Sequence, residues 1–194
     1  PRVVSVIGAG VAGTQSISKA LDNHALVKVL DTSQAKLHQL ESEFGSNNIE
    51  YILSTNDSIQ SAINDSDLVV GSVYVVGKEA PKVVTKDMLA SMNPGTVMVD
   101  VSIDQGGCFE SSRPTTHDDP TFIENDIVHY CVTNMPGAVP LTATQALNKV
   151  TLSYIEELAN KGIDKALDEN EHLRNGLNIK NGIITHSGVK EALE

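Results

Sequence analysis

The sequence predicts an α/β domain with a doubly wound parallel sheet, followed by a mainly helical C-terminal segment. Short runs of β-branched and apolar residues alternate with stretches whose apolar positions repeat at helical spacing. The strand-like runs are continuously apolar, which is typical of strands that helices cover on both faces. Because crossovers between parallel strands are right-handed, this alternation favours helices on both sides of one open sheet.

The elements follow one another in order through the first 140 residues. Strands are expected at Val3–Ile7, Ala25–Leu30, Ile49–Leu53, Leu68–Gly71, Thr96–Val101 and Ile127–Val132. Helices are expected at Val11–Leu21, Ser33–Phe44, Asp57–Ile63 and Thr85–Met92. Thr85 is the predicted cap of its helix, and Asn93-Pro94-Gly95 is the predicted end. The stretch from Asp104 to Asn125 is predicted as a long loop, and such a loop in a compact domain is more often functional.

The alternation stops after Pro140, where we place a domain boundary between residues 1–140 and 141–194. Helices are expected at Leu141–Lys161, near Ile163–Leu167 and near Gly188–Leu193. Asn181-Gly182 predicts a hairpin turn between them.

Composition narrows the class of protein. The formal net charge of -11 disfavours nucleic acid as a partner, because an acidic chain repels phosphate backbones. No apolar run approaches the roughly 20 residues of a membrane helix. The two cysteines, Cys108 and Cys131, lack metal-ligand spacing and need no disulfide, so a reducing, cytoplasmic setting is expected. The chain opens directly on a strand without an initiator methionine, which suggests that further sequence lies upstream.

The strongest chemical signal is Gly8-Ala9-Gly10-Val11-Ala12-Gly13, which follows a strand and opens a helix. In this dinucleotide-binding pattern of Rossmann folds, Gly8 permits a tight turn, Gly10 lets the backbone approach a pyrophosphate, and Gly13 allows close helix packing. The helix N-terminus at Val11 and Ala12 offers free N–H groups to the phosphates. A glycine-rich turn that binds nothing is the alternative.

Asp31 ends the second predicted strand, 18 residues after Gly13. A carboxylate at this spacing accepts hydrogen bonds from the adenosine ribose and repels a 2′-phosphate, which favours NAD over NADP. Lys36 is the near cation, and a solvated helix lysine is its simpler interpretation.

Asp104 lies just past the fifth predicted strand, before Gly106 and Gly107. Ligands of open α/β sheets bind outside the carboxyl ends of the strands, so a carboxylate there can exchange a proton with a substrate. From physics alone, an aspartate that caps a turn is an equal alternative.

The runs Asp104–Glu110, Ser112–Thr121 and His129–Pro140 resemble alanine dehydrogenase, and the resemblance extends through the whole chain. The related transhydrogenase NAD domain resembles the Asp104–Pro140 stretch less well. One departure is Leu141, where family members often carry a basic residue.

The resemblance implies roles for individual residues. Asp104 matches the catalytic aspartate at the nicotinamide, Asn134 and Met135 match residues of the nicotinamide pocket, and Asp31 and Lys36 match adenosine-side positions. Further positions that match cofactor contacts are Val73 and Val101.

The implied reaction is the reversible, NAD-dependent oxidative deamination of L-alanine to pyruvate and ammonia, by a homo-oligomer. The family's substrate-binding Arg and Lys and its catalytic His lie in an amino-terminal region outside this chain. We therefore expect residues 1–140 to bind NAD and residues 141–194 to belong to the substrate domain. The alternatives are the nucleotide domain of a transhydrogenase and a non-catalytic Rossmann sensor or assembly module.

Two histidines invite other readings. His117 lies beside Asp118 and Asp119, and this grouping is open to a metal or proton-relay role, but loop structure is the favoured interpretation. His129 lies in a predicted strand and is expected to be a core histidine with satisfied hydrogen bonds. No zinc spacing and no nucleophilic triad is found, and the two cysteines are expected to be small buried hydrophobes.

Overall fold

The computed structural model describes residues 1–75 and 79–193. The chain divides into two compact units, and the division falls between Met135 and Pro136, a few residues before the boundary expected at Pro140. The first unit contains the sheet, and the second contains the helices that follow it.

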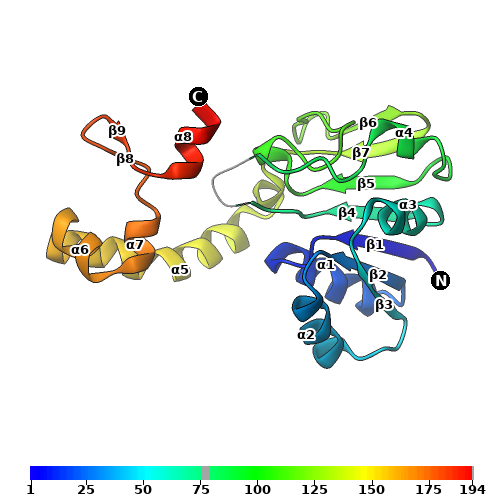
Figure 1. The fold of residues 1–194 in the computed structure, drawn as a ribbon, viewed down its shortest axis with the longest axis horizontal. Coiled ribbons are helices and arrows are strands. Elements are labelled where there is room, and N and C mark those ends of the chain that lie inside the picture. Colours follow the sequence, from blue (N-terminus) through cyan, green and yellow to red (C-terminus); the bar gives the residue numbers. More distant parts are fainter. Residues whose placement is uncertain (76–78, 194) are drawn as a thin grey trace. The chain divides into compact units, whose positions relative to one another are not determined.

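The first unit is built on a 7-stranded sheet with the order β3-β2-β1-β4-β5-β7-β6 (Figure 1). All neighbouring strands pair in parallel except β6 with β7, which are antiparallel. The strands are β1 (Val3–Ile7), β2 (Leu26–Asp31), β3 (Ile49–Leu53), β4 (Leu68–Gly71), β5 (Val97–Asp100), β6 (Thr121–Glu124) and β7 (Ile127–Tyr130). The predicted doubly wound parallel sheet is thereby confirmed.

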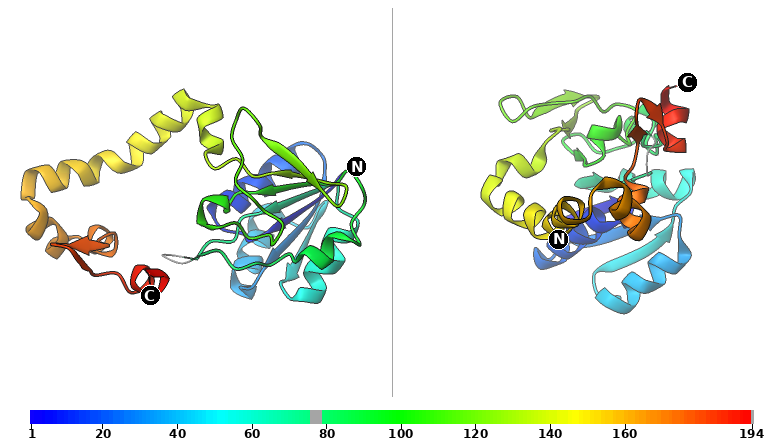
Figure 2. Two further views of the ribbon diagram at one scale, coloured as in Figure 1. Left: turned by 90° about the horizontal axis from the view of Figure 1, so that it is seen from above. Right: turned by 90° about the vertical axis from the view of Figure 1, so that its left-hand side faces the viewer.

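Helices cover both faces of this sheet (Figures 1 and 2). The helices are α1 (Val11–Asp22), α2 (Gln34–Phe44), α3 (Asn56–Asn64) and the short α4 (Lys86–Leu89). Alternate residues of β1 serve the two cores: Val4 and Val6 pack with residues of α1 and α2, and Ile7 packs with residues of α3 and α4. Strands buried on both faces explain the continuous apolar runs.

The predicted loop between Asp104 and Asn125 was wrong in one respect, because its end forms strand β6. Asn125 and Asp126 both have positive φ, 52° and 62°, and form a two-residue turn that pairs β6 with β7. A two-residue turn with positive φ at both positions has a backbone twist that matches the twist of the two strands it joins. The Asn-Asp pair between two apolar runs was the signal for this edge strand.

Thr85 is the N-cap residue of α4, as predicted, but its side chain makes no capping hydrogen bond. The N–H of Lys86 instead donates to Glu110 Oε2 at 2.8 Å. The helix is also shorter than expected and ends at Leu89 rather than Met92. A carboxylate from a distant loop therefore replaces the local cap.

The second unit is mainly helical, as predicted. It contains α5 (Pro140–Lys161), α6 (Ile163–Glu169), α7 (Glu171–Asn175), a hairpin of β8 (Ile179–Lys180) and β9 (Ile183–Ile184), and α8 (Ser187–Leu193). Asn181 and Gly182 form the expected turn of the hairpin. None of the described helices is long and apolar enough to cross a membrane.

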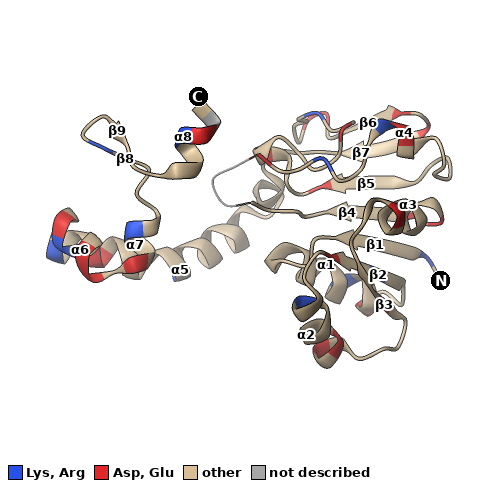
Figure 3. Ribbon diagram, in the orientation of Figure 1, with Lys and Arg blue, Asp and Glu red and all other residues tan. Residues whose placement is uncertain are grey.

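Acidic and basic side chains are interspersed along the surface helices of the second unit (Figure 3). Lys161 pairs with Glu157 at 2.7 Å and with Glu169 at 2.9 Å, which ties the end of α5 to the end of α6. Exposed pairs of this kind contribute little stability one by one.

Candidate functional site

The candidate site lies where the strand order changes direction. The chain passes from β1 to β2 and β3 on one side, and then returns to β4 beside β1. The carboxyl ends of β1 and β4 therefore carry connections that diverge, and Gly8 and Ser72 at these ends both line a crevice. Ligands of doubly wound sheets bind at such a switch point.

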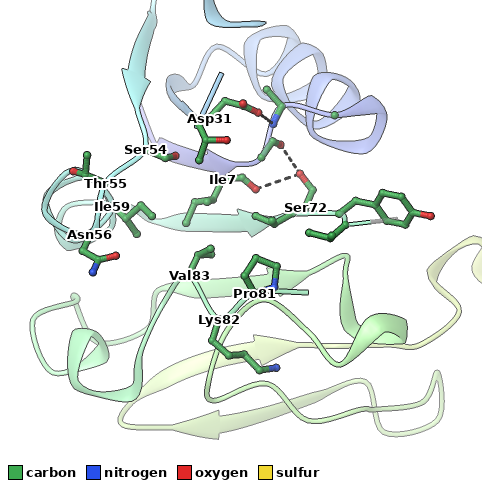
Figure 4. Close-up of a pocket in the computed structure, with 17 residues that line it drawn as sticks. Ile7, Asp31, Ser54, Thr55, Asn56, Ile59, Ser72, Pro81, Lys82 and Val83 are labelled. Atoms are coloured by element: carbon green, nitrogen blue, oxygen red, sulfur yellow. Dashed lines mark hydrogen bonds between the residues drawn. The ribbon is translucent and has the colours of Figure 1, made fainter. Parts of the chain in front are cut away.

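Each of the three positions in the β1–α1 loop is occupied by glycine for a different physical reason. Gly8 has a φ of +91°, and a Cβ there would lie 2.7 Å from the Ser72 carbonyl oxygen. A Cβ at Gly13 would lie 2.0 Å from the Gly8 carbonyl oxygen, so α1 packs too closely for any side chain. Gly10 has no heavy atom within 4 Å of its Cβ position, so the chain there faces open space. Ser72 Oγ also donates to the Gly8 carbonyl at 2.6 Å and fixes the loop (Figure 4).

The N-terminus of α1 opens onto the crevice. Gly10 is its N-cap residue, and no side chain of the described residues caps it. Val11, an apolar residue, is 87% exposed there. The unpaired N–H groups and the helix dipole make this end attractive to an anion.

Asp31 stands at the end of β2 with its carboxylate fixed by the backbone. Oδ2 accepts from the N–H of Ala9 at 2.8 Å (Figure 4). Oδ1 accepts from the N–H of Ser33 at 2.8 Å. A carboxylate has about four acceptor positions, so two remain free for a ligand.

Two cavities meet in the crevice, with volumes of about 590 and 490 Å³. The first is lined on one side by Asp31, Ser54, Thr55, Asn56 and Ile59, and on the other by Val73, Pro81, Lys82 and Val83 (Figure 4). The second is lined by Val11, Ala12, Val101, Ser102, Asp104 and Gln105. Three residues line both, namely Gly10, Ser72 and Tyr74. Two adjoining cavities of this size suit an elongated ligand with a bulky group at each end.

Not every expected residue joins the crevice. Lys36 lies in the first turn of α2 and is not among the described residues that line either cavity. Asn134 and Met135 follow β7 and also lie outside the described linings. His117 Nε2 contacts the Asn134 carbonyl oxygen at 2.6 Å, which gives this histidine the loop-stabilising role expected of it.

Asp104 lies on a short 3₁₀ helix, Ile103–Gln105, directly after β5. It is exposed and lines the second cavity. No described residue donates a hydrogen bond to its carboxylate, which therefore stays available to exchange a proton with a ligand.

Asp100 is a buried carboxylate that the sequence reading missed. Its oxygens accept from the backbone N–H groups of Ser102 at 3.0 Å, Cys108 at 2.9 Å and Phe109 at 3.2 Å, and from Ser112 Oγ at 2.5 Å. An acid at the end of a buried strand was the available signal. These bonds compensate the burial of the charge and hold the loop that carries Asp104.

The remaining titratable candidates are structural. His129 is buried, lies 2.8 Å from Ser111 Oγ and 3.1 Å from the Ile127 carbonyl, and stacks on Phe122, which confirms a satisfied core histidine. Burial lowers the pKa of His129. Burial raises the pKa of both cysteine thiols, so they stay protonated. In the part of the chain that the structure describes, no cluster of His, Cys, Asp and Glu could hold a metal ion.

The fold and the crevice together define a nucleotide-binding domain of the Rossmann type. Residues 1–187 match the family model described as "Alanine dehydrogenase/PNT, C-terminal domain", and the chain belongs to this family. The resemblance seen in the sequence is thereby confirmed.

Curated relatives include an alanine dehydrogenase of Halomonas elongata, 48% identical over 192 residues, and one of Staphylococcus saprophyticus, 49% identical over 191. The alignments cover 99% and 98% of this chain but 52% and 51% of the relatives. The chain thus spans about half the length of the curated relatives it matches.

Among solved structures, an L-alanine dehydrogenase superimposes with a TM-score of 0.87 at 41% identity, over 100% of this chain and 53% of that one. A transhydrogenase from Sinorhizobium meliloti superimposes with a TM-score of 0.75 at 24% identity, over 96% of this chain and 50% of that one, and shows the shared fold alone.

The family and fold imply a nicotinamide cofactor, and the residues present fit one. Gly10 leaves open space beside an uncapped helix N-terminus, where a pyrophosphate would lie. Gln105 lines the second cavity, and its Oε1 is buried without a hydrogen-bond partner among the described residues. A ligand amide, such as the carboxamide of nicotinamide, would satisfy that oxygen.

Proposed function

We propose that this chain is the cofactor-binding part of an enzyme that oxidises L-alanine to pyruvate and ammonia, reversibly, with NAD. The observation that carries the proposal is the placement of two carboxylates in one crevice. Asp31 lies in one cavity, Asp104 lies in the other, and the open loop at Gly10 lies between them. The name of the relatives, alanine dehydrogenase, supports this reaction over others available to a Rossmann domain.

The proposal assigns the cofactor's parts to the chain's own groups. Asp31 accepts the ribose hydroxyl groups and excludes a 2′-phosphate, which selects NAD over NADP. The loop from Gly8 to Gly13, with Val11 and Ala12, faces the pyrophosphate. The remaining assignments follow from the family resemblance: Lys36 on the adenosine side, Val73 and Val101 as walls, and Asn134 and Met135 at the nicotinamide.

The bound nicotinamide supplies the hydride acceptor that side chains lack. The protein's part is to hold the cofactor and to move protons. Protons are transferred when the amine is oxidised and again when the resulting imine is hydrolysed. The exposed Asp104 carboxylate is placed to exchange these protons. Residues 141–194 belong, in this proposal, to the domain that holds alanine.

The proposal includes a cytoplasmic homo-oligomer. Two free, buried cysteines are in keeping with a reducing compartment. Helix α5 has no buried residue and exposes Leu147, Val150 and Ile155, an apolar surface of the kind that protein contacts cover.

Titration of the 194-residue chain with NADH and NADPH tests cofactor binding directly, by the fluorescence of the bound nicotinamide. We expect saturable NADH binding with a clear preference over NADPH. Asp31→Asn should reduce that preference, and Asp22→Asn, which changes an exposed acid of α1, should not. A millimolar dissociation constant already describes a weak complex. If binding does not saturate at about millimolar NADH, the cofactor site is ruled out.

Alanine-dependent NADH formation by the protein purified from its native host tests the reaction. A protein that binds NADH and instead transfers hydride from NADH to an NADP analogue is a transhydrogenase. A protein that binds NADH and performs neither reaction is a sensor or assembly module.

A further inference from the structure

We propose that Lys82 is a positioning residue, whose ammonium group holds the Gly106–Gly107 turn and thereby keeps Asp104 in place. The part of this inference that concerns catalysis rests on the proposed function, in which Asp104 exchanges protons with the substrate. The hold on the turn is a property of the described structure and is tested separately below.

A short segment, Ala80–Lys86, runs alongside the loop that carries Asp104 and is bonded to it at successive points. The N–H of Ala80 donates to the Gln105 carbonyl at 2.9 Å, and the N–H of Val83 donates to the Cys108 carbonyl at 2.8 Å. The N–H of Glu110 returns a bond to the Val84 carbonyl at 2.8 Å. The two stretches are therefore joined by backbone hydrogen bonds into one two-stranded ribbon.

Lys82 lies in the middle of this ribbon, and its side chain reaches the Gly106–Gly107 turn. Its Nζ donates to the Gly107 carbonyl at 2.7 Å and also to the Gly106 carbonyl. Figure 4 shows the side chain directed away from Asp31 and the rest of the first cavity. Two of the three ammonium protons are thus committed to the turn.

The opposite side of the same turn faces the buried carboxylate of Asp100. The peptide group between Gly107 and Cys108 offers its carbonyl to Lys82 and its N–H to Asp100 Oδ2 at 2.9 Å. One peptide plane is therefore held between a cation and an anion, and both contacts are charge-assisted hydrogen bonds. This arrangement orients the peptide dipole and opposes rotation of the turn.

The turn needs such support because its backbone is unusual. Gly106 and Gly107 have φ values of +86° and +77°, and glycine is freer than any other residue to leave such a conformation. A Cβ at Gly107 would lie 2.7 Å from Asp100 Oδ2, so the turn cannot be stiffened by a side chain of its own. Lys82 and Asp100 supply from outside the rigidity that the glycines lack.

The same segment also touches the first cavity. Pro81 and Val83 line the side facing Ile59, while their neighbour Lys82 holds the turn beside Asp104. The segment that lines the first cavity is therefore hydrogen-bonded to the loop that carries Asp104.

The test compares Lys82→Met, Lys82→Arg and the matched control Lys86→Met. Lys86 lies on the same segment, but its Nζ forms an exposed ion pair with Glu124 at 3.1 Å. The first measurement is amide hydrogen exchange of the peptide that contains Gly106 to Phe109. We expect about tenfold faster exchange in Lys82→Met, as loss of one or two charge-assisted bonds implies, with Lys82→Arg close to wild type and the control unchanged.

The second measurement is NADH affinity together with the kinetics and pH profile of alanine oxidation by the protein from its native host. In Lys82→Met we expect NADH affinity within about threefold of wild type, while kcat falls about tenfold or more and its pH profile shifts. Lys82→Arg should recover most of kcat, since a guanidinium also donates to two carbonyls.

Wild-type exchange and wild-type kcat in Lys82→Met would overturn the proposal. Unchanged exchange with NADH affinity lost would show that Lys82 contacts the ligand instead. If the wild-type protein does not oxidise alanine, the proposed function fails, and the exchange measurement still decides whether Lys82 holds the turn. If Lys82→Met does not fold, Lys82→Gln, which retains one donor, is measured in the same way.

Discussion

Replacing Gly10 or Gly13 by alanine should separate cofactor binding from folding within one loop. Gly10 has a φ of -66°, which alanine adopts freely, and its added methyl group meets no atom within 4 Å. The methyl group at Gly13 would lie 2.0 Å from the Gly8 carbonyl oxygen and 2.7 Å from Ser72 Oγ. The first change leaves the packing untouched, and the second drives α1 against the backbone of the loop.

The two effects on stability differ in size. For Gly10→Ala, a weaker N-cap and a less flexible unfolded chain oppose each other, so the free energy of unfolding changes by less than about 1 kcal/mol. For Gly13→Ala, overpacking against a fixed backbone costs about 3 kcal/mol. In a chain of this size that lowers Tm by roughly 6–12 °C.

Gly10→Ala, which changes stability little, should weaken NADH binding strongly. A methyl group at Gly10 occupies the space through which the pyrophosphate approaches the N–H groups of α1. Losing one charge-assisted hydrogen bond there costs about 1.5–3 kcal/mol, or roughly ten- to hundredfold in affinity.

Fluorescence titration with NADH and a thermal melt on each variant measure both quantities. Gly176→Ala serves as the control, because Gly176 lies in the second unit and its added Cβ comes no nearer than 3.4 Å to another atom. Wild-type affinity in Gly10→Ala would refute the assigned path of the pyrophosphate. An unchanged melting temperature in Gly13→Ala would refute the packing argument.

Three further outcomes are expected. Asp31→Ala should weaken NADH binding roughly ten- to hundredfold and bring NADH and NADPH closer in affinity, as measured by paired titrations. Asp104→Ala should lower the rate of alanine oxidation about 100-fold or more, with NADH affinity nearly unchanged, and a rate near wild type would remove Asp104 from the chemistry. Because burial lowers the pKa of His129 below its ordinary value of 6.5, the unfolded chain binds the extra proton first as the pH falls. The free energy of unfolding should therefore be highest above pH 6.5 and should fall below that pH, by at most about 1.4 kcal/mol per pH unit from this group. Urea unfolding at pH 7.5 and pH 5.5 measures this decrease. The contribution of His129 to the decrease should be absent in His129→Gln.

The sequence by itself determined the fold class, the family and the glycine-rich loop between β1 and α1. These features depend on short-range patterns: continuous apolar runs for buried strands, helical periodicity between them, and three glycines at fixed offsets after β1. Asp31 was found in the same way, because the end of a strand and a spacing from Gly13 are both local properties. The long resemblance through Asp104–Pro140 predicted the family that the comparisons confirmed.

The tertiary structure decided which residues meet. Asp100 and Lys82 lie 18 residues apart, and their shared hold on one peptide group arises from the register between a segment after β4 and a loop after β5. Glu110 replaces Thr85 at the start of α4 for the same reason. Partners of this kind follow from the packing of distant segments, and no local periodicity encodes them. Local sequence thus specifies where each strand ends, whereas the pairing of strands specifies which ends face one another across the crevice.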